Sequence, residues 1–295
     1  MELHLVVVYI AVFILMIVLN SWEIHLLRKS NNKPNYEKIL LSLTVCDLMG
    51  ALIALILTAI ITLITYVPIN LSPATFWFIS GVTQPYWACV SLLHLICISF
   101  DRLWAVQSPI HHMTNATKKK LYIAIAFSWL APTLIPTAYV ADTISKGAKM
   151  EDMKNLLIMN TYQCGAILVL IADIIFVIVY SVIIGIVRKN RSVTRRYRHG
   201  QQEQSKKALV FCICIVLVFV INKAPFVAVY VIKWNSPKWL SDMAQIIFPF
   251  DHMLNSIIYL IQKYHKNAAQ SAKTSLQFNA SNLETRRNTI ETEGI

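Results

Sequence analysis

Long runs of apolar residues, separated by short polar stretches, dominate this sequence. A helix that crosses a membrane needs roughly 20 mainly apolar residues, and seven runs are close to or above that length. They predict seven membrane-spanning helices over about Leu3–Leu27, Ile39–Tyr66, Thr75–Val106, Leu121–Tyr139, Leu156–Val187, Ala208–Trp234 and Leu240–Gln262. The pattern therefore predicts an all-α membrane protein built as a seven-helix bundle.

The polar end of the chain predicts two further features. We expect a short amphipathic helix after the seventh span, held on anionic lipid by Lys263, Lys266 and Lys273. The remaining polar residues predict a disordered cytoplasmic tail. Residues 1–275 then form one transmembrane domain, and residues 276–295 form the tail.

Composition excludes several classes of protein. Hydrophobic residues make up 56% and charged residues 14%, against roughly 25% charged residues in soluble proteins, so a soluble enzyme is not expected. No Gly-rich phosphate loop, HExxH motif or nucleophile elbow occurs, and we predict that the chain is not an enzyme. The six Cys lie in or beside apolar runs without metal-ligand spacing, so we expect no disulfide and no metal site.

The net charge of +12 lies mostly on one side of the predicted spans. That side carries 21 of the 27 Lys and Arg residues, which places it in the cytoplasm, with the N-terminus outside. The charge thus indicates a multi-pass plasma-membrane protein, with anionic lipid as a partner rather than nucleic acid. The sequon at Asn70 faces outward and is a glycosylation candidate, whereas the one at Asn115 faces the cytoplasm.

Several polar residues lie inside the predicted spans, where an ionised group costs roughly 2.5–3.5 kcal/mol on insertion scales. Such groups should face the bundle interior and pair, either as structural contacts between helices or as a functional network. We expect His94, which lies among leucines, to be a core histidine with satisfied hydrogen bonds; the role of Asp173 stays open. The candidates for the buried network are Asn20, Asp47, Ser91, Lys223 and Asp251, with His252 and Asn255 nearby.

Motifs along the spans give the predicted bundle a family. Asp101-Arg102-Leu103 ends the third span, and Pro109 follows. This resembles the Asp-Arg-Tyr motif of rhodopsin-like G-protein-coupled receptors. Similar matches occur at Asn20 in the first span, Asp47 in the second, Trp129 in the fourth, Tyr180 in the fifth, Pro225 in the sixth and Asn255-Ser256-Ile257-Ile258-Tyr259 in the seventh.

The resemblance implies a signalling mechanism. Arg102 would hold the closed state through Asp101, and would turn towards Tyr180 when the sixth helix swings outward to admit a heterotrimeric G protein. Asn255 and Tyr259 would take part in the same switch. Arrestin and a receptor kinase are further partners that the family implies.

Departures from the family pattern are also informative. Trp77 replaces the family's third-helix Cys, and Lys223 replaces the sixth-helix toggle tryptophan. Family members often bind sodium beside this point, through positions that here are Asp47, Ser91, Asp251 and Asn255. We predict that Lys223 pairs with Asp251, Asp47 or both, so that its ammonium stands in for sodium and the chain has no cofactor.

The resemblance also predicts a ligand cavity. Only about two residues precede the first span, which favours a small molecule or a short peptide over a large hormone. Gln84 stands where amine receptors carry Asp, so a protonated amine has no obvious anchor there. The expected lining is Gln84, Ala88, Phe226, Tyr230 and Gln245.

A receptor that couples a small extracellular ligand to a G protein is therefore the favoured interpretation. Two alternatives stay open: a seven-helix ion or proton transporter that uses the buried charges as a relay, and a receptor-like protein without signalling.

Overall fold

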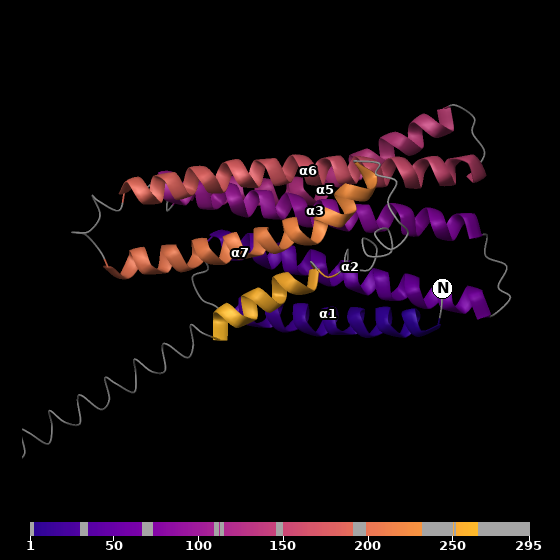
Figure 1. The fold of residues 1–295 in the computed structure, drawn as a ribbon, viewed down its shortest axis with the longest axis horizontal. Helices are drawn as coiled ribbons and strands as arrows, with labels where there is room; N and C mark the ends of the chain where they lie inside the picture. Colours follow the sequence, from indigo (N-terminus) through magenta and orange to yellow (C-terminus); the bar gives the residue numbers. More distant parts are fainter. Residues whose placement is uncertain are drawn as a thin grey trace, which may run out of the picture.

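The computed structural model describes residues 3–29, 35–66, 73–108, 112, 115–145, 150–190, 199–231, 250 and 252–264. This part of the chain forms seven long helices, most of which run side by side (Figure 1). They are α1 (Leu3–Lys29), α2 (Asn35–Tyr66), α3 (Pro73–Gln107), α5 (Asn115–Ser145), α6 (Met150–Asn190), α7 (His199–Tyr230) and a helix over residues 252–264. The all-helical architecture that the apolar runs predict is confirmed.

Length and composition mark five of these helices as able to cross a membrane, among the residues described. The stretches are Val6–Lys29, Asn35–Ile60, Tyr86–Gln107, Gln163–Lys189 and Cys212–Tyr230. Helix is the expected form because a backbone in lipid must satisfy its hydrogen bonds within the segment. Basic residues in the last turns of α1 and α6 also complement the negative end of each helix dipole.

The helices extend beyond the apolar runs that predict them. The fourth predicted span becomes α5, which is longer at both ends, and the fifth becomes α6, which begins at Met150. The predicted spans leave an outer loop of about Ala141 to Asn155 between the fourth and the fifth. This prediction is wrong, because most of these residues are helical and only residues 146–149 separate α5 from α6. The apolar run marks the depth of the hydrocarbon layer, and a helix can continue past it into water.

The packing buries several polar side chains and leaves many large apolar side chains exposed. Leu130, Val177 and Ile221 are 66%, 66% and 69% exposed, whereas Asn20 and Lys223 have no exposed surface. Exposed apolar surface of this extent is unfavourable in water and is expected where lipid surrounds the protein. This distribution supports a membrane location.

Helix α3 lies at the centre of the bundle and contacts α2, α5, α6 and α7 (Figure 1). Helix α1 packs on α2, and α6 packs on α7. The main apolar core joins side chains of all of these helices, including Leu43 of α2, Leu95 of α3, Phe176 of α6 and Phe219 of α7. The central position of α3 lets its side chains contact both halves of the bundle.

Several predictions concern residues outside the described part of the chain. The amphipathic helix after residue 264 and the tail belong to this group, as do Asn70, Gln245 and Asp251. The division at residue 275 stays a prediction, and so does the orientation of the bundle in the membrane.

Candidate functional site

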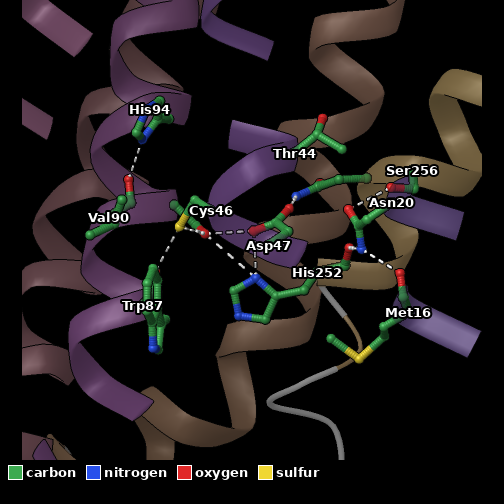
Figure 2. Close-up of polar contacts among 12 residues, drawn as sticks. Met16, Asn20, Thr44, Cys46, Asp47, Trp87, Val90, His94, His252 and Ser256 are labelled. Atoms are coloured by element: carbon green, nitrogen blue, oxygen red, sulfur yellow. Dashed lines mark hydrogen bonds and ion pairs between the residues drawn. The ribbon is translucent and has the colours of Figure 1, made fainter. Parts of the chain in front are cut away.

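A buried polar cluster joins α1, α2, α3 and the helix over residues 252–264 (Figure 2). Each helix presents its polar residues on the face towards the others. Helical spacing explains this for α1, where Asn20 and Glu23 are three residues apart and therefore share a face. The cluster members are Asn20, Glu23, Thr44, Asp47, Ser91, His252, Asn255 and Ser256, all of them buried.

Asp47 is the centre of one half of this cluster. Its Oδ1 atom accepts hydrogen bonds from Ser91 Oγ at 2.8 Å and from His252 Nδ1 at 2.7 Å. Its Oδ2 atom accepts a longer bond of 3.3 Å from Asn255 Nδ2. Three donors from two other helices therefore meet on one carboxylate.

The same geometry bears on the sodium site that the resemblance implies. A carboxylate oxygen only accepts hydrogen bonds, so the Nδ1 atom of His252 carries a hydrogen that points at Asp47 Oδ1. This N–H group occupies the coordination position on Oδ1 that a cation would need. While His252 donates to Oδ1, that atom has no coordination position for a sodium ion, and only the long Asn255 contact lies on Oδ2.

The other half of the cluster is centred on Ser256. Its Oγ atom lies 2.8 Å from Asn20 Oδ1 and 2.6 Å from Glu23 Oε2. Asn20 Nδ2 donates to the carbonyl oxygens of Met16, at 2.8 Å, and His252, at 3.4 Å. These contacts connect α1 directly to the helix over residues 252–264.

The structure brings together part of the predicted network. Asn20, Asp47 and Ser91 lie in the cluster, and Asp251 lies outside the described residues. Lys223 of α7 is fully buried, with its Nζ atom 5.7 Å from the centre of the Phe219 ring. The pairing of Lys223 with a carboxylate stays a prediction.

Glu23 and Ser256 were not among the predicted network residues, and His252 was noted only as a neighbour. Glu23 lies in the polar last part of the first apolar run, close to Arg28, where a carboxylate suggests the membrane surface. Its spacing of three residues from Asn20 was the available signal. Ser256 replaces a motif proline, and the sequence does not show that its hydroxyl group meets Glu23.

A second polar cluster lies at the end of α3 and contains the predicted switch. Asp101 Oδ2 accepts two hydrogen bonds from the Arg102 guanidinium, one from Nε at 3.1 Å and one from Nη2. His112 Nε2 contacts the other oxygen, Oδ1, at 2.7 Å. The guanidinium carbon of Arg102 also lies 4.4 Å from the centre of the Tyr36 ring, a cation–π contact from α2.

The remaining predicted switch residues are spread over the bundle. Tyr180 of α6 is buried, and its hydroxyl group accepts a bond of 3.3 Å from Ser99 of α3. Tyr259 is buried in the main apolar core. Asn255 belongs to the Asp47 cluster and not to the Arg102 cluster. The arrangement thus places Arg102 on Asp101, with Tyr180 engaged elsewhere.

Three of the predicted ligand-pocket residues have described side chains. Ala88 of α3 and Phe226 of α7 are buried, and Tyr230 is half-buried. The Phe226 and Tyr230 rings pack with their centres 4.9 Å apart. The side chains of Gln84 and Gln245 are not among those described, so the composition of the cavity stays a prediction.

His94 is a core histidine with satisfied hydrogen bonds, as expected. Its Nδ1 atom lies 2.8 Å from the carbonyl oxygen of Val90, and its Nε2 atom lies 2.9 Å from Ser42 Oγ. Trp129 Nε1 donates to the same Ser42 hydroxyl group at 3.0 Å. These contacts connect α2, α3 and α5.

The fold and these two buried clusters define a helical membrane protein with a polar interior and a charged pair at one end of its central helix. The chain belongs to the 7 transmembrane receptor (rhodopsin family) group, whose family model matches residues 24–259. Members of this family are receptors, so the prediction that the chain is not an enzyme is confirmed.

Similar proteins include named receptors for two signalling molecules. Octopamine receptor beta-1R of Drosophila melanogaster is 28% identical over 143 residues, which is 45% of this chain and 27% of that protein. The 5-hydroxytryptamine receptor 1B of Homo sapiens is 27% identical over 103 residues, which is 35% of this chain and 25% of that protein. Octopamine receptor beta-2R of Chilo suppressalis is 40% identical over 50 residues, 17% of this chain and 13% of that protein. The matched stretches therefore cover less than a third of these relatives.

Proposed function

We propose that this rhodopsin-family receptor lies in the plasma membrane and transmits the binding of a small extracellular ligand to a heterotrimeric G protein. The observation that carries the proposal is the contact of Arg102 with Asp101 and with the Tyr36 ring, at the end of the central helix α3. The guanidinium thus has one charged and one aromatic neighbour, Asp101 and Tyr36, and can exchange them for others. A conformational change of this kind can couple a ligand to a partner.

In the proposed mechanism, the contact with Asp101 holds the closed state. Outward movement of α7 opens the cytoplasmic end of the bundle, and Arg102 exchanges Asp101 for the hydroxyl group of Tyr180. Tyr180 already lies on the face of α6 that packs on α3, so the movement required of Arg102 is local. Tyr259 moves towards the same opening.

The ligand is proposed as a small molecule. The relatives are named for octopamine and 5-hydroxytryptamine, and both compounds carry an amine. At the third-helix position where amine receptors carry Asp, this chain has Gln84, which offers no charge to a protonated amine. We therefore propose a ligand that does not depend on a carboxylate from α3.

Further proposals concern cations, lipid and regulation. No sodium ion is resident beside Asp47, and a buried ammonium from Lys223 supplies positive charge to this region instead. Lys263, Lys266 and Lys273 hold the segment after the last span on anionic lipid. Arg286-Arg287-Asn288-Thr289 resembles a basophilic kinase site, through which a receptor kinase and arrestin would regulate the receptor.

The test is G-protein activation in cells without added ligand, measured for wild type, Arg102→Ala, Lys223→Trp and Phe100→Ala. Phe100 is the matched control, because it lies two residues from Arg102 on α3 and is 49% exposed. We expect a basal signal in wild type and Phe100→Ala that Arg102→Ala abolishes. A change in this signal with Lys223→Trp would connect the buried charge to the switch.

An absent signal in all four proteins, with surface expression shown by labelling, would contradict basal coupling. A basal signal that Arg102→Ala leaves unchanged would contradict the role proposed for Arg102.

A further inference from the structure

The hydroxyl group of Ser256 lies between two oxygen atoms that both require a hydrogen. Its Oγ atom is 2.8 Å from Asn20 Oδ1 and 2.6 Å from Glu23 Oε2. Both distances are those of O–H···O hydrogen bonds, but a serine hydroxyl has one hydrogen to donate. One of the two contacts must therefore obtain its hydrogen from another group.

The orientation of the Asn20 amide is fixed by its other contacts. Its Nδ2 atom lies 2.8 Å from the carbonyl oxygen of Met16 and 3.4 Å from that of His252, and both of these oxygens only accept. The amide oxygen therefore faces Ser256, as Figure 2 shows. An amide oxygen has no hydrogen, so Asn20 does not supply the missing one.

Glu23 is the group that can supply it. If Glu23 is ionised, Asn20 Oδ1 and Glu23 Oε2 compete for the single hydroxyl hydrogen of Ser256. One of the two short oxygen–oxygen contacts then has no hydrogen between its atoms. If Glu23 is protonated on Oε2, it donates to Ser256 Oγ, and Ser256 donates to Asn20 Oδ1. We infer that Glu23 is a proton-binding site, and that its bound proton connects α1 to the helix over residues 252–264.

Burial supports the neutral form of Glu23. The residue has no exposed surface, and in the described part of the chain its Oε1 atom has no hydrogen-bond partner. An ionised carboxylate needs several donors or a positive partner when it is buried. Asp47 has three donors. Glu23 has only the Ser256 hydroxyl group, which also contacts Asn20, and the Thr44 hydroxyl group, which donates to the Leu40 carbonyl oxygen.

The titratable groups that face this site come from the neighbouring helices. Asp47 of α2 adds a negative charge that favours the neutral form of Glu23. His252, which contacts Asp47, and Tyr259 come from the helix over residues 252–264. None of these described contacts replaces the hydrogen that the Ser256 bridge lacks.

A protonated Glu23 makes the bundle sensitive to pH. Above about pH 4.3 an unfolded chain releases the glutamic acid proton, whereas the folded protein retains it. The folded state then binds more protons, so the free energy of unfolding falls as the pH rises. The proton site rests on the fold alone, whereas any effect on signalling rests on the function proposed above.

Infrared spectroscopy of the purified full-length receptor tests the site. A protonated carboxylic acid has a C=O stretching band that is distinct from carboxylate and amide bands. We expect this band in wild type, its loss in Glu23→Gln, and its retention in Glu37→Gln, a matched control at the end of α2. A wild-type band that Glu23→Gln leaves unchanged would overturn the proposal.

Thermal unfolding at a series of pH values gives a second measurement. Wild type should melt at a lower temperature as the pH rises, with no change when sodium replaces a large organic cation. Glu23→Gln should flatten this dependence, because its amide N–H group donates to Ser256 at every pH. A dependence on sodium and not on pH would overturn the proton site.

If Glu23→Gln does not fold, Ser256→Ala keeps the proposal testable. It removes the acceptor of the Glu23 hydrogen bond, so the infrared band should shift in frequency and not disappear. If Ser256→Ala leaves the frequency of this band unchanged, the proposed hydrogen bond between Glu23 and Ser256 is overturned. If wild type shows the infrared band but no basal signalling, the result counts against the proposed function and not against the proton site.

Discussion

Ser42 shows how many contacts a single hydroxyl group can hold in this apolar bundle. It accepts the hydrogen of Trp129 Nε1 and contacts His94 Nε2, so one oxygen joins side chains from α5 and α3 to α2. None of the contacts described for these three residues reaches Asp101 or Arg102. The Ser42 contacts are therefore a structural connection whose loss should appear in stability.

We predict that Ser42→Ala lowers the free energy of unfolding by about 1–3 kcal/mol, because it leaves buried polar groups of Trp129 and His94 without a partner. Thermal unfolding in detergent measures the effect. Thr133→Ala is the control, since this exposed hydroxyl group only bonds the Leu130 carbonyl oxygen of its own helix. Equal melting temperatures for Ser42→Ala and wild type would show that the hydroxyl group contributes little.

Sequence alone predicts single residues well where a residue type is unusual for its position. Asn20, Asp47 and Ser91 are polar residues in apolar runs, and the structure gathers them. Sequence alone does not predict Glu23 because its partner Ser256 is 233 positions away. In addition, a carboxylate near the basic end of a span is expected to face water. The contact between Glu23 and Ser256 forms only when the helices pack, so no local sequence pattern predicts it.

At the scale of single helices, α7 carries the most unusual combination of residues. It contains Pro225, which removes a backbone donor, two residues after the fully buried Lys223. The Lys223 side chain lies over Phe219, whose ring packs edge-on against Phe176 of α6. A buried ammonium therefore lies at the interface between α7 and its neighbours.

We predict that Lys223→Met lowers the free energy of unfolding by about 3–5 kcal/mol, because it leaves a buried carboxylate without its counter-charge. Sodium should restore part of this loss in the variant and not in wild type. Thermal unfolding with and without sodium measures both effects. The control is Ile221→Met, a change at an exposed position of the same helix.

The outcome that contradicts this pairing is equally clear. If Lys223→Met matches wild type in stability and in its response to sodium, the ammonium has no carboxylate partner. Contact with the Phe219 ring would then be sufficient to hold it.

Helix ends were the least predictable feature at this scale. The apolar run predicts the fifth span from about Leu156, whereas α6 begins at Met150. The residues in between include Glu151, Asp152 and Lys154, and such polar residues can form helix once a helix has been nucleated. Hydropathy predicts the buried length of each helix, whereas its full length also depends on neighbours.

At the scale of the whole molecule, the distribution of polarity is the reverse of that in a soluble protein. The network around Asp47 is buried, and side chains such as Val177 and Ile221 face outward. The sequence predicts this arrangement from composition and from the length of its apolar runs. It does not predict which polar groups meet, since those contacts join α1 and α2 to a helix more than 200 residues further along the chain.

The orientation of the bundle gives the last prediction. Helices α1 and α6 end, and α5 begins, at the same end of the bundle (Figure 1), and Lys29, Lys120 and Arg188 all lie there. Basic residues remain on the cytoplasmic side during insertion, so this end should face the cytoplasm. The opposite end, which Asn70 is expected to join, should face outward.

A C-terminal tag should therefore bind antibody only after cells are permeabilised, because the tail is predicted to lie on the basic side. Glycosidase treatment should shift the electrophoretic mobility of wild type and of Asn115→Gln, but not of Asn70→Gln. The Asn115 sequon is the control because its predicted position is cytoplasmic, where no glycan is added. Antibody binding to intact cells would reverse the assigned orientation, and it would place the Arg102 cluster on the side that no G protein can reach.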